Sequence, residues 1–186
     1  MCAAALLSED AACEDTAVTL TVSGAGDPVT VRLSAAADGV RTAAVTMPRP
    51  LRITDIELPG TGRAPVVFFP GIAHVILPFT ADRSAPASAA AQWASLLKAD
   101  AVGLLFFDRE ASLMEPLVCV PAAGTLVWER SCASGTTAVG AYLADTENTP
   151  VSLPIRQPGG ILTVDAAPGG PPVLTGSVRR RGGGCL

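Results

Sequence analysis

The chain has 186 residues, of which 49% are hydrophobic and 16% are charged, and its formal net charge is −4 at pH 7. A chain of this length and hydrophobicity can bury a core, which excludes a disordered protein, and its acidic balance argues against nucleic-acid binding. No apolar run approaches the roughly 20 residues that cross a bilayer, and no basic flank of a secretory signal opens the chain. We therefore expect a cytoplasmic protein with neither nucleic-acid nor membrane partners.

Short strands are predicted in the first third of the chain, because alternating or β-branched runs are separated there by Gly, Pro and Asp turns. A helix is predicted at 85–99, with Pro86 in its first turn, and a buried strand at 101–107 follows it directly. The strands expected before this helix are 17–22, 28–33, 40–47, 51–58, 65–69 and 74–77.

The second half of the chain returns to strands after Pro116, and a second, Ala-rich helix is predicted at 134–144. Many strands around two lone helices favour an α+β fold in which each sheet curls about a helix. The stretch 165–171 is rich in turn residues and is expected to be exposed. The strands expected in this half are 117–120, 125–128, 151–155, 160–164 and 172–178.

The five cysteines form no Cys-x-x-Cys pair, and His74 is the single histidine, so the sequence supports neither a zinc site nor a disulfide framework. We expect no metal. Four of the cysteines are interpreted as small buried or incidental residues, since free cysteine behaves mostly as a small hydrophobe. These four are Cys2, Cys13, Cys119 and Cys185.

Cys132 differs from the others because a β-prone segment ends there in a small-residue turn that opens the second predicted helix. A thiol at a helix N-terminus faces unpaired backbone N–H groups and the positive end of the helix dipole, which lower its pKa. The same N–H groups can hold a carboxylate. We therefore expect a reactive thiol beside an anion-binding helix terminus.

The Glu129-Arg130 pair, followed by Cys132, two small residues, Gly and Thr, resembles the second-half cysteine motif of the diaminopimelate epimerase superfamily, the cofactor-independent amino-acid racemases and epimerases. Only Ser131 separates the pair from the cysteine, a spacing most similar to that of histidine racemase-like members or proline racemases. Three further segments resemble family motifs in the same order, namely 42–50, 71–75 and 174–176.

The resemblance implies a diaminopimelate epimerase-like α+β fold, with curled mixed and antiparallel sheets each wrapped around a central helix. Residues 1–58 would be the remainder of the N-terminal lobe, 59–170 the C-terminal lobe with the Cys132 helix, and 171–186 a closing strand that returns to the first lobe. The family's first-half Cys-Gly-Asn-Gly motif is missing, and Cys2 is followed by alanines. We therefore expect an N-terminally shortened member with an incomplete first lobe, and the exposed apolar surface would favour a homodimer.

The resemblance also implies a mechanism, in which two cysteines on opposite faces of an amino acid remove and return the proton on Cα without any cofactor. Cys132 would be one acid/base, and the backbone N–H groups of Ala133 and Ser134 would bind the α-carboxylate. Glu129 would hold the substrate ammonium, and Arg130 would fix the substrate or the loop. The second base stays unassigned.

Four residues of this reading have a plainer interpretation as well. Cys132 could be a buried structural thiol at a tight turn. His74, on an apolar strand, is either a packing histidine or a site residue that orients Cys132. Glu129 and Arg130 could form an ion pair at the end of a strand, which contributes little if it is exposed.

The predicted substrate is a smaller or monopolar amino acid rather than diaminopimelate. Ile72 stands where the epimerase has an asparagine that grips the distal end of its substrate, and the strand at 101–104 lacks a second asparagine. An apolar pocket would leave a distal ammonium and carboxylate buried without partners.

Two other functions remain open from the sequence. In the first, Cys132 is the nucleophile of a hydrolase or transferase and His74 is its base, with a covalent acyl intermediate. In the second, the chain is a non-catalytic amino-acid-binding or structural protein that keeps the fold.

Overall fold

The computed structural model describes residues 15–21, 28–35 and 37–179. The interpretations given for Cys2, Cys13 and Cys185 concern positions outside these ranges. The described part contains strands β1 (Thr16–Leu20), β2 (Val29–Leu33), β3 (Val40–Thr46), β4 (Arg52–Leu58), β5 (Gly62–Phe69), β6 (Ile72–Pro78), β7 (Ala101–Asp108), β8 (Leu113–Val120), β9 (Thr125–Trp128), β10 (Val151–Gln157), β11 (Gly160–Ala166) and β12 (Val173–Arg179), helices α2 (Ser84–Leu97) and α3 (Ala133–Glu147), and the 3₁₀ turn η2 (Pro121–Ala123).

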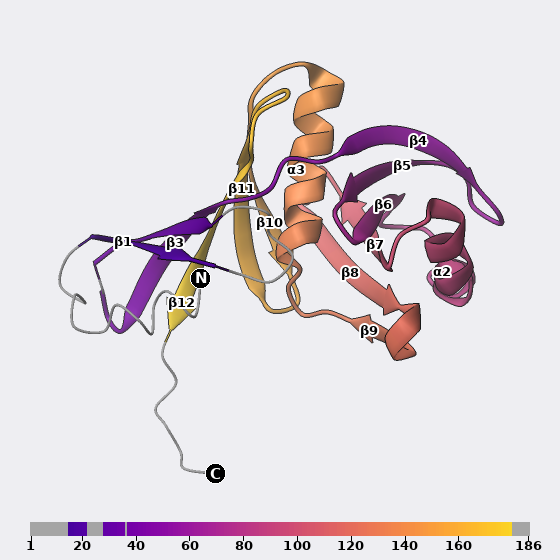
Figure 1. Cartoon of the computed structure of the whole chain (residues 1–186), viewed down its shortest axis with the longest axis horizontal. Helices are drawn as coiled ribbons and strands as arrows, with labels where there is room; N and C mark the ends of the chain where they lie inside the picture. Colours follow the sequence, from indigo (N-terminus) through magenta and orange to yellow (C-terminus); the bar gives the residue numbers. More distant parts are fainter. Residues whose placement is uncertain (1–14, 22–27, 36, 180–186) are drawn as a thin grey trace, which may run out of the picture.

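The described strands join into one sheet of the order β1-β2-β3-β12-β11-β10-β8-β7-β6-β5-β4, with β9 added beside β8 (Figure 1). Most neighbours are antiparallel, and the parallel pairs are β6 with β7 and β10 with β8. β12 lies between β3 and β11, so the end of the described chain returns to strands near its start. This sheet-rich architecture with two helices agrees with the predicted α+β class.

Helix α2 connects the parallel strands β6 and β7, a connection that needs a crossover segment. It packs on β7 and β8. Lys98, which has a φ of 54°, ends the helix in the left-handed conformation. Its buried face consists of Pro86, Ala90, Trp93, Ala94 and Leu97.

Helix α3 packs against strands and contacts β10, β11 and β12 as well as β5 and β6 (Figure 1). Its residues from Gly135 to Ala141 are all buried, and most of them are small. Small side chains let the strands approach the helix axis closely. The N-terminus of α3, where Cys132 lies, is therefore held inside the molecule.

Several strands are longer than the sequence predicted, and two of them extend past a proline that stood at or just before the predicted start, namely Pro65 and Pro116. β5 begins at Gly62, and Pro65 lies opposite Asp55 of β4 within the ladder. β8 begins at Leu113, and Pro116 lies opposite Leu105 of β7. A proline lacks only the N–H donor, and the carbonyl of Pro116 still accepts a hydrogen bond from the N–H of Glu129.

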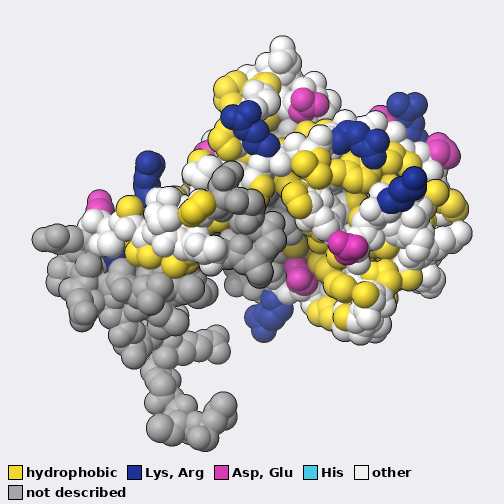
Figure 2. Space-filling view, viewed as in Figure 1, with side chains coloured by type: hydrophobic (Ala, Val, Ile, Leu, Met, Phe, Trp, Pro, Cys, Tyr) yellow, Lys and Arg dark blue, Asp and Glu magenta, His cyan; other side chains and the backbone are white. Residues whose placement is uncertain are grey.

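The face of the molecule in Figure 2 carries acidic and basic side chains interspersed among hydrophobic ones. Among the helices of the described residues, none combines the length and the hydropathy that a membrane crossing requires.

We predict that Gly140→Ala destabilises the protein, although alanine is the better helix former. A Cβ at Gly140 would lie 2.5 Å from Cγ2 of Val164, which is buried on β11 and has no room to yield. Overpacking of this kind costs about 1–3 kcal/mol, against a propensity gain of about 1 kcal/mol. Urea unfolding measures the change.

The double variant Gly140→Ala/Val164→Ala is the control, because it removes the atoms that would clash. The two substitutions should be less destabilising together than the sum of the single effects. A more stable Gly140→Ala single variant would contradict the close approach of α3 to β11.

Candidate functional site

Cys132 is the N-cap residue of α3, with extended backbone angles (φ −119°, ψ 105°). The segment 129–131 leads to it from the end of β9. The residue is only 4% exposed, and its sulfur is a free thiol. The predicted position at a helix N-terminus therefore agrees with the structure. The thiol is buried, however, and not exposed to solvent as it would be at a helix terminus on the surface.

A closed ring of buried hydrogen bonds fixes the backbone at Cys132. The Cys132 N–H donates to Oε1 of Gln157 at 2.7 Å, and Nε2 of Gln157 donates to Oγ1 of Thr136 at 2.8 Å. The Thr136 hydroxyl then donates to the Cys132 carbonyl at 2.8 Å. Sequence reasoning missed Gln157 and Thr136, because nothing in the local pattern shows that the end of β10 meets the start of α3.

Three groups surround the sulfur of Cys132. The Glu129 carboxylate and the backbone N–H of Gly135 both lie near enough to the sulfur to act on its pKa. The Ser134 hydroxyl oxygen lies 3.7 Å from Sγ. The sulfur therefore lies between an anion and the first turn of the helix.

Burial, together with the adjacent Glu129 carboxylate, raises the pKa of the Cys132 thiol to about 12. The Gly135 amide and the Ser134 hydroxyl act in the opposite direction. The prediction of a lowered pKa is therefore wrong for the free protein. The helix amides have the predicted sign, but the loss of water and the negative neighbour outweigh them.

His74 on β6 is fully buried, and its Nε2 lies 3.0 Å from the Ser134 hydroxyl oxygen. Its ring lies where a side chain on Gly103 of β7 would be, since a Cβ there would overlap Nδ1. Desolvation lowers the pKa of His74 to about 4, so the ring is neutral at neutral pH. Ser134 thus stands between His74 and Cys132.

The other predicted site residues line the entry to α3. Ala133 and Ser134 are the first two residues of the helix, whose amides have no partner within a helix. Arg130 is exposed, and its carbonyl accepts a hydrogen bond from the N–H of Gly159 in the β10–β11 turn. The structure brings Cys132, Glu129, Ser134 and His74 together. Arg130 lies beside this group with an exposed side chain, and its backbone carbonyl makes the contact with Gly159.

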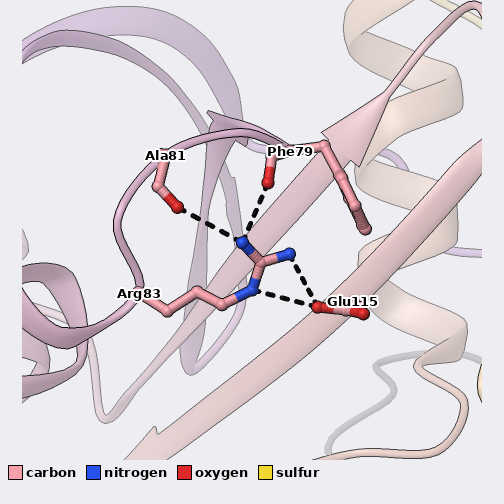
Figure 3. A network of polar contacts seen from close by, with 4 residues as sticks. All are labelled: Phe79, Ala81, Arg83 and Glu115. Atoms are coloured by element: carbon pink, nitrogen blue, oxygen red, sulfur yellow. Dashed lines mark hydrogen bonds and ion pairs between the residues drawn. The ribbon is translucent and has the colours of Figure 1, made fainter.

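A pocket of about 310 Å³ that was not predicted adjoins Glu129. One wall is an ion pair in which Nε and Nη2 of Arg83 contact Oε2 of Glu115 at 3.0 and 2.8 Å (Figure 3). Nη1 of the same arginine donates to the carbonyls of Phe79 and Ala81. The lining residues are Arg83, Glu115, Trp128, Glu129 and Pro158.

No group of three or more His, Cys, Asp or Glu side chains within the described ranges could hold a metal ion. The groups around Cys132 can exchange a proton with a ligand, and the helix terminus can bind an anion.

Comparison with solved structures shows a similar fold in two proteins. A predicted epimerase from Pseudomonas aeruginosa matches with a TM-score of 0.65 and 18% identity, over 96% of this chain and 72% of that one. A protein described as phenazine biosynthesis PhzC/PhzF from Clostridium difficile matches with a TM-score of 0.51 and 10% identity, over 84% and 61% of the two chains. At these identities the likeness concerns the fold alone.

Comparison with curated sequences gives histidine racemases. A histidine racemase from Staphylococcus aureus is 34% identical over 74 residues, which are 39% of this chain and 26% of the relative. One from Fusobacterium nucleatum is 28% identical over 135 residues, 69% of this chain and 51% of the relative. The chain thus spans about half or less of the length of these relatives. Residues 1–170 match the family model of the histidine racemase CntK N-terminal domain, and the chain therefore belongs to this family.

Proposed function

We propose that this chain carries a cysteine half-site of a cofactor-independent amino-acid racemase or epimerase, with Cys132 as an acid/base at Cα. The observation that carries the proposal is the placement of the Cys132 sulfur between the Glu129 carboxylate and the first turn of α3. Family membership supports the reaction class, and the names of the curated relatives favour histidine as the substrate.

In this proposal the two ends of the substrate's α-amino-acid group bind to different groups of the site. The α-carboxylate accepts hydrogen bonds from the first-turn amides of Ala133 and Ser134, at the positive end of α3. The ammonium pairs with Glu129. Negative charge that develops on the carboxylate as Cα loses its proton is stabilised by the same amides, which are already oriented.

The state of the thiol depends on Glu129. In the free protein, burial and this carboxylate keep the proton on sulfur, so Cys132 is poised to donate a proton to Cα. An ammonium bound to Glu129 offsets its negative charge and lowers the pKa of the thiol. In the reverse direction the thiolate then takes the proton from Cα and becomes the thiol again.

The division of the chain into lobes is also part of the proposal. We propose two lobes, with 1–58 in the first, 59–170 in the second and 171–186 closing back on the first, and sheets curled around central helices. The pairing of β12 with β3 supports this division. Two further points stay predictions. One is that a second base acts on the opposite face of Cα, and the other is that two copies of the chain form a dimer.

A cysteine nucleophile is the second candidate. The observation that favours it is the buried link from His74 through Ser134 to Cys132. His74 bonds to the Ser134 hydroxyl rather than to the sulfur, and its lowered pKa makes it a weak base. These features favour the racemase. A non-catalytic binding protein would bind amino acids without exchanging the proton on Cα.

Cys132→Ala should abolish the exchange of the Cα proton of L-histidine in deuterated water, because the proton carrier is lost. General acid–base groups contribute about 10²- to 10⁴-fold to the rate. Proton NMR of the substrate measures the exchange. Cys119→Ala is the matched control, since Cys119 is also a buried free thiol but lies on β8. Equal exchange by the Cys132→Ala variant and the parent would overturn the role of this sulfur.

Glu129→Gln should have opposite effects on the thiol and on the reaction. Removing the negative neighbour lowers the pKa of Cys132, and each unit gives about tenfold more thiolate at pH 8. Alkylation of Cys132 by iodoacetamide, followed by peptide mass spectrometry, should therefore become faster. Exchange at Cα should become slower, because the ammonium loses its partner. Slower alkylation would contradict the assigned contact between Glu129 and the sulfur.

The buried His74 should make the protein less stable as the pH falls from about 6.5 to about 4. Over this range the unfolded chain binds a proton that the folded chain does not, so the free energy of unfolding decreases by an amount on the order of 3 kcal/mol. Urea unfolding at several pH values measures the change.

The control for this pH effect is His74→Gln, which should show a shallower dependence over the same range. Because His74 is the single histidine, its C2–H resonance also reports its protonation directly. A resonance that titrates near pH 6.5 in the folded protein would refute the neutral, buried ring.

A further inference from the structure

Gln157 connects two parts of the molecule that are far apart in the sequence. It is the last residue of β10, it pairs with Gly160 across the β10–β11 hairpin, and it is only 6% exposed. Its side-chain amide bonds to the Cys132 N–H at the start of α3 and to the Thr136 hydroxyl just beyond it. A buried amide that is bonded at both ends keeps one orientation, because neither end can turn to water.

Donors and acceptors fix the direction of this amide. A backbone N–H only donates, so Oε1 of Gln157 must face Cys132, and Nε2 must then face Oγ1 of Thr136. Oγ1 accepts that hydrogen bond, and its own hydrogen goes to the Cys132 carbonyl. An ionised glutamate in place of Gln157 would lack the donor, and an apolar side chain would lack both groups. One side chain therefore sets both backbone groups of Cys132.

The β10–β11 hairpin also contacts the chain at a second point, just before Cys132. The Gly159 N–H donates to the Arg130 carbonyl, and a Cβ on Gly159 would lie 2.8 Å from that oxygen. Only glycine allows so close an approach. The hairpin thus holds the chain on both sides of Ser131, and the sheet, more than the loop, positions the sulfur.

The bond to Gln157 also decides which amides at the start of α3 stay free. The first N–H groups of a helix have no partner inside the helix. Of these, the Cys132 N–H is taken by Gln157, and the Gly135 N–H acts on the sulfur, whose pKa it lowers. The amides of Ala133 and Ser134 are the two that neither group uses. A carboxylate bound to these two amides therefore has a defined position relative to the sulfur.

We propose that Gln157 is a positioning residue of the reaction, and that Thr136 extends its hold to the carbonyl of Cys132. Together they fix the direction from which the sulfur meets Cα of a ligand bound to the helix amides. In this role neither side chain touches the ligand or carries the proton. The inference rests on the proposed function, since it takes Cys132 as the acid/base.

The test measures kcat and KM for the Cα exchange of L-histidine in deuterated water. Thr136→Val keeps the shape of the side chain and removes its hydroxyl, and Gln157→Met keeps the length and removes both amide groups. Each should lower kcat about 10- to 100-fold and leave KM within about threefold, because a displaced sulfur slows proton transfer without removing a contact to the ligand. Thr136→Ser, which retains the hydroxyl, should restore kcat.

Thr137→Val is the matched control. Thr137 is as fully buried as Thr136, and its hydroxyl donates to the Ala133 carbonyl at 2.8 Å, so this variant loses an equivalent bond in the same helix. Gln157 has no part in that bond. Thr137→Val should be less stable in urea unfolding, while its kcat stays at that of the parent. An equal loss of kcat in Thr136→Val and Thr137→Val would show a purely structural role and overturn the proposal.

Two residues that act through one ring should not have independent effects. The double variant Gln157→Met/Thr136→Val should therefore lose little more kcat than the more affected single variant. Losses that multiply would contradict the shared ring. The Thr136 variants decide the question even if Gln157→Met does not fold, because they leave the Cys132 N–H bonded to Gln157.

The same assays separate this inference from the proposed function. Exchange by the parent and its loss in Cys132→Ala, with kcat unchanged in Thr136→Val, would leave the racemase proposal standing and overturn the positioning role. A parent that exchanges the Cα proton of no amino acid would overturn the racemase activity of this chain, and the positioning role with it.

Discussion

The ring of hydrogen bonds between Gln157, Thr136 and the backbone of Cys132 holds together the parts of the molecule on which the site depends. It connects the end of β10 to the first turn of α3 and leaves the cysteine backbone with both its N–H and its carbonyl bonded. Because the ring is buried, its members have no water to replace a lost partner, and the turn has little freedom to move. The position of the sulfur relative to Glu129 and Ser134 follows from this constraint.

Burial gives the same turn its chemical character. A helix terminus exposed to water would favour the thiolate, whereas Cys132 lies among the strands that pack against α3 and beside a carboxylate. The two influences on the sulfur oppose each other, and the unfavourable environment of the charged form prevails. Desolvation has the corresponding effect on a basic group, since it lowers the pKa of His74 and keeps its ring neutral. The site at rest is therefore a protonated thiol near a neutral imidazole.

The elements of the fold were largely predictable from the sequence, and most boundaries lie within a few residues of those observed. β9 was predicted with its observed bounds, because a short β-prone run between turns is a local signal. The strands predicted at Pro65 and after Pro116 begin earlier than expected, at Gly62 and Leu113, since the sequence does not show which carbonyls and amides of a strand are needed for pairing.

The site was predictable only where its residues are neighbours in the chain. Glu129, Cys132 and Ser134 lie within six residues, and a helix start connects them. Gln157 reaches the same region from another strand, so its role depends on tertiary pairing that no local pattern reveals. The pKa of Cys132 was wrong for a related reason, because helix position is visible in a sequence and depth of burial is not.

The adjacency of Trp128 and Glu129 has one more consequence. Their Cα atoms are separated by a single peptide unit, about 3.8 Å, and yet both side chains line one pocket. Trp128 pairs with Leu117 of β8, which holds the backbone of this pair against the sheet. The pairing of β9 with β8 therefore decides where this wall of the pocket lies relative to the rest of the sheet.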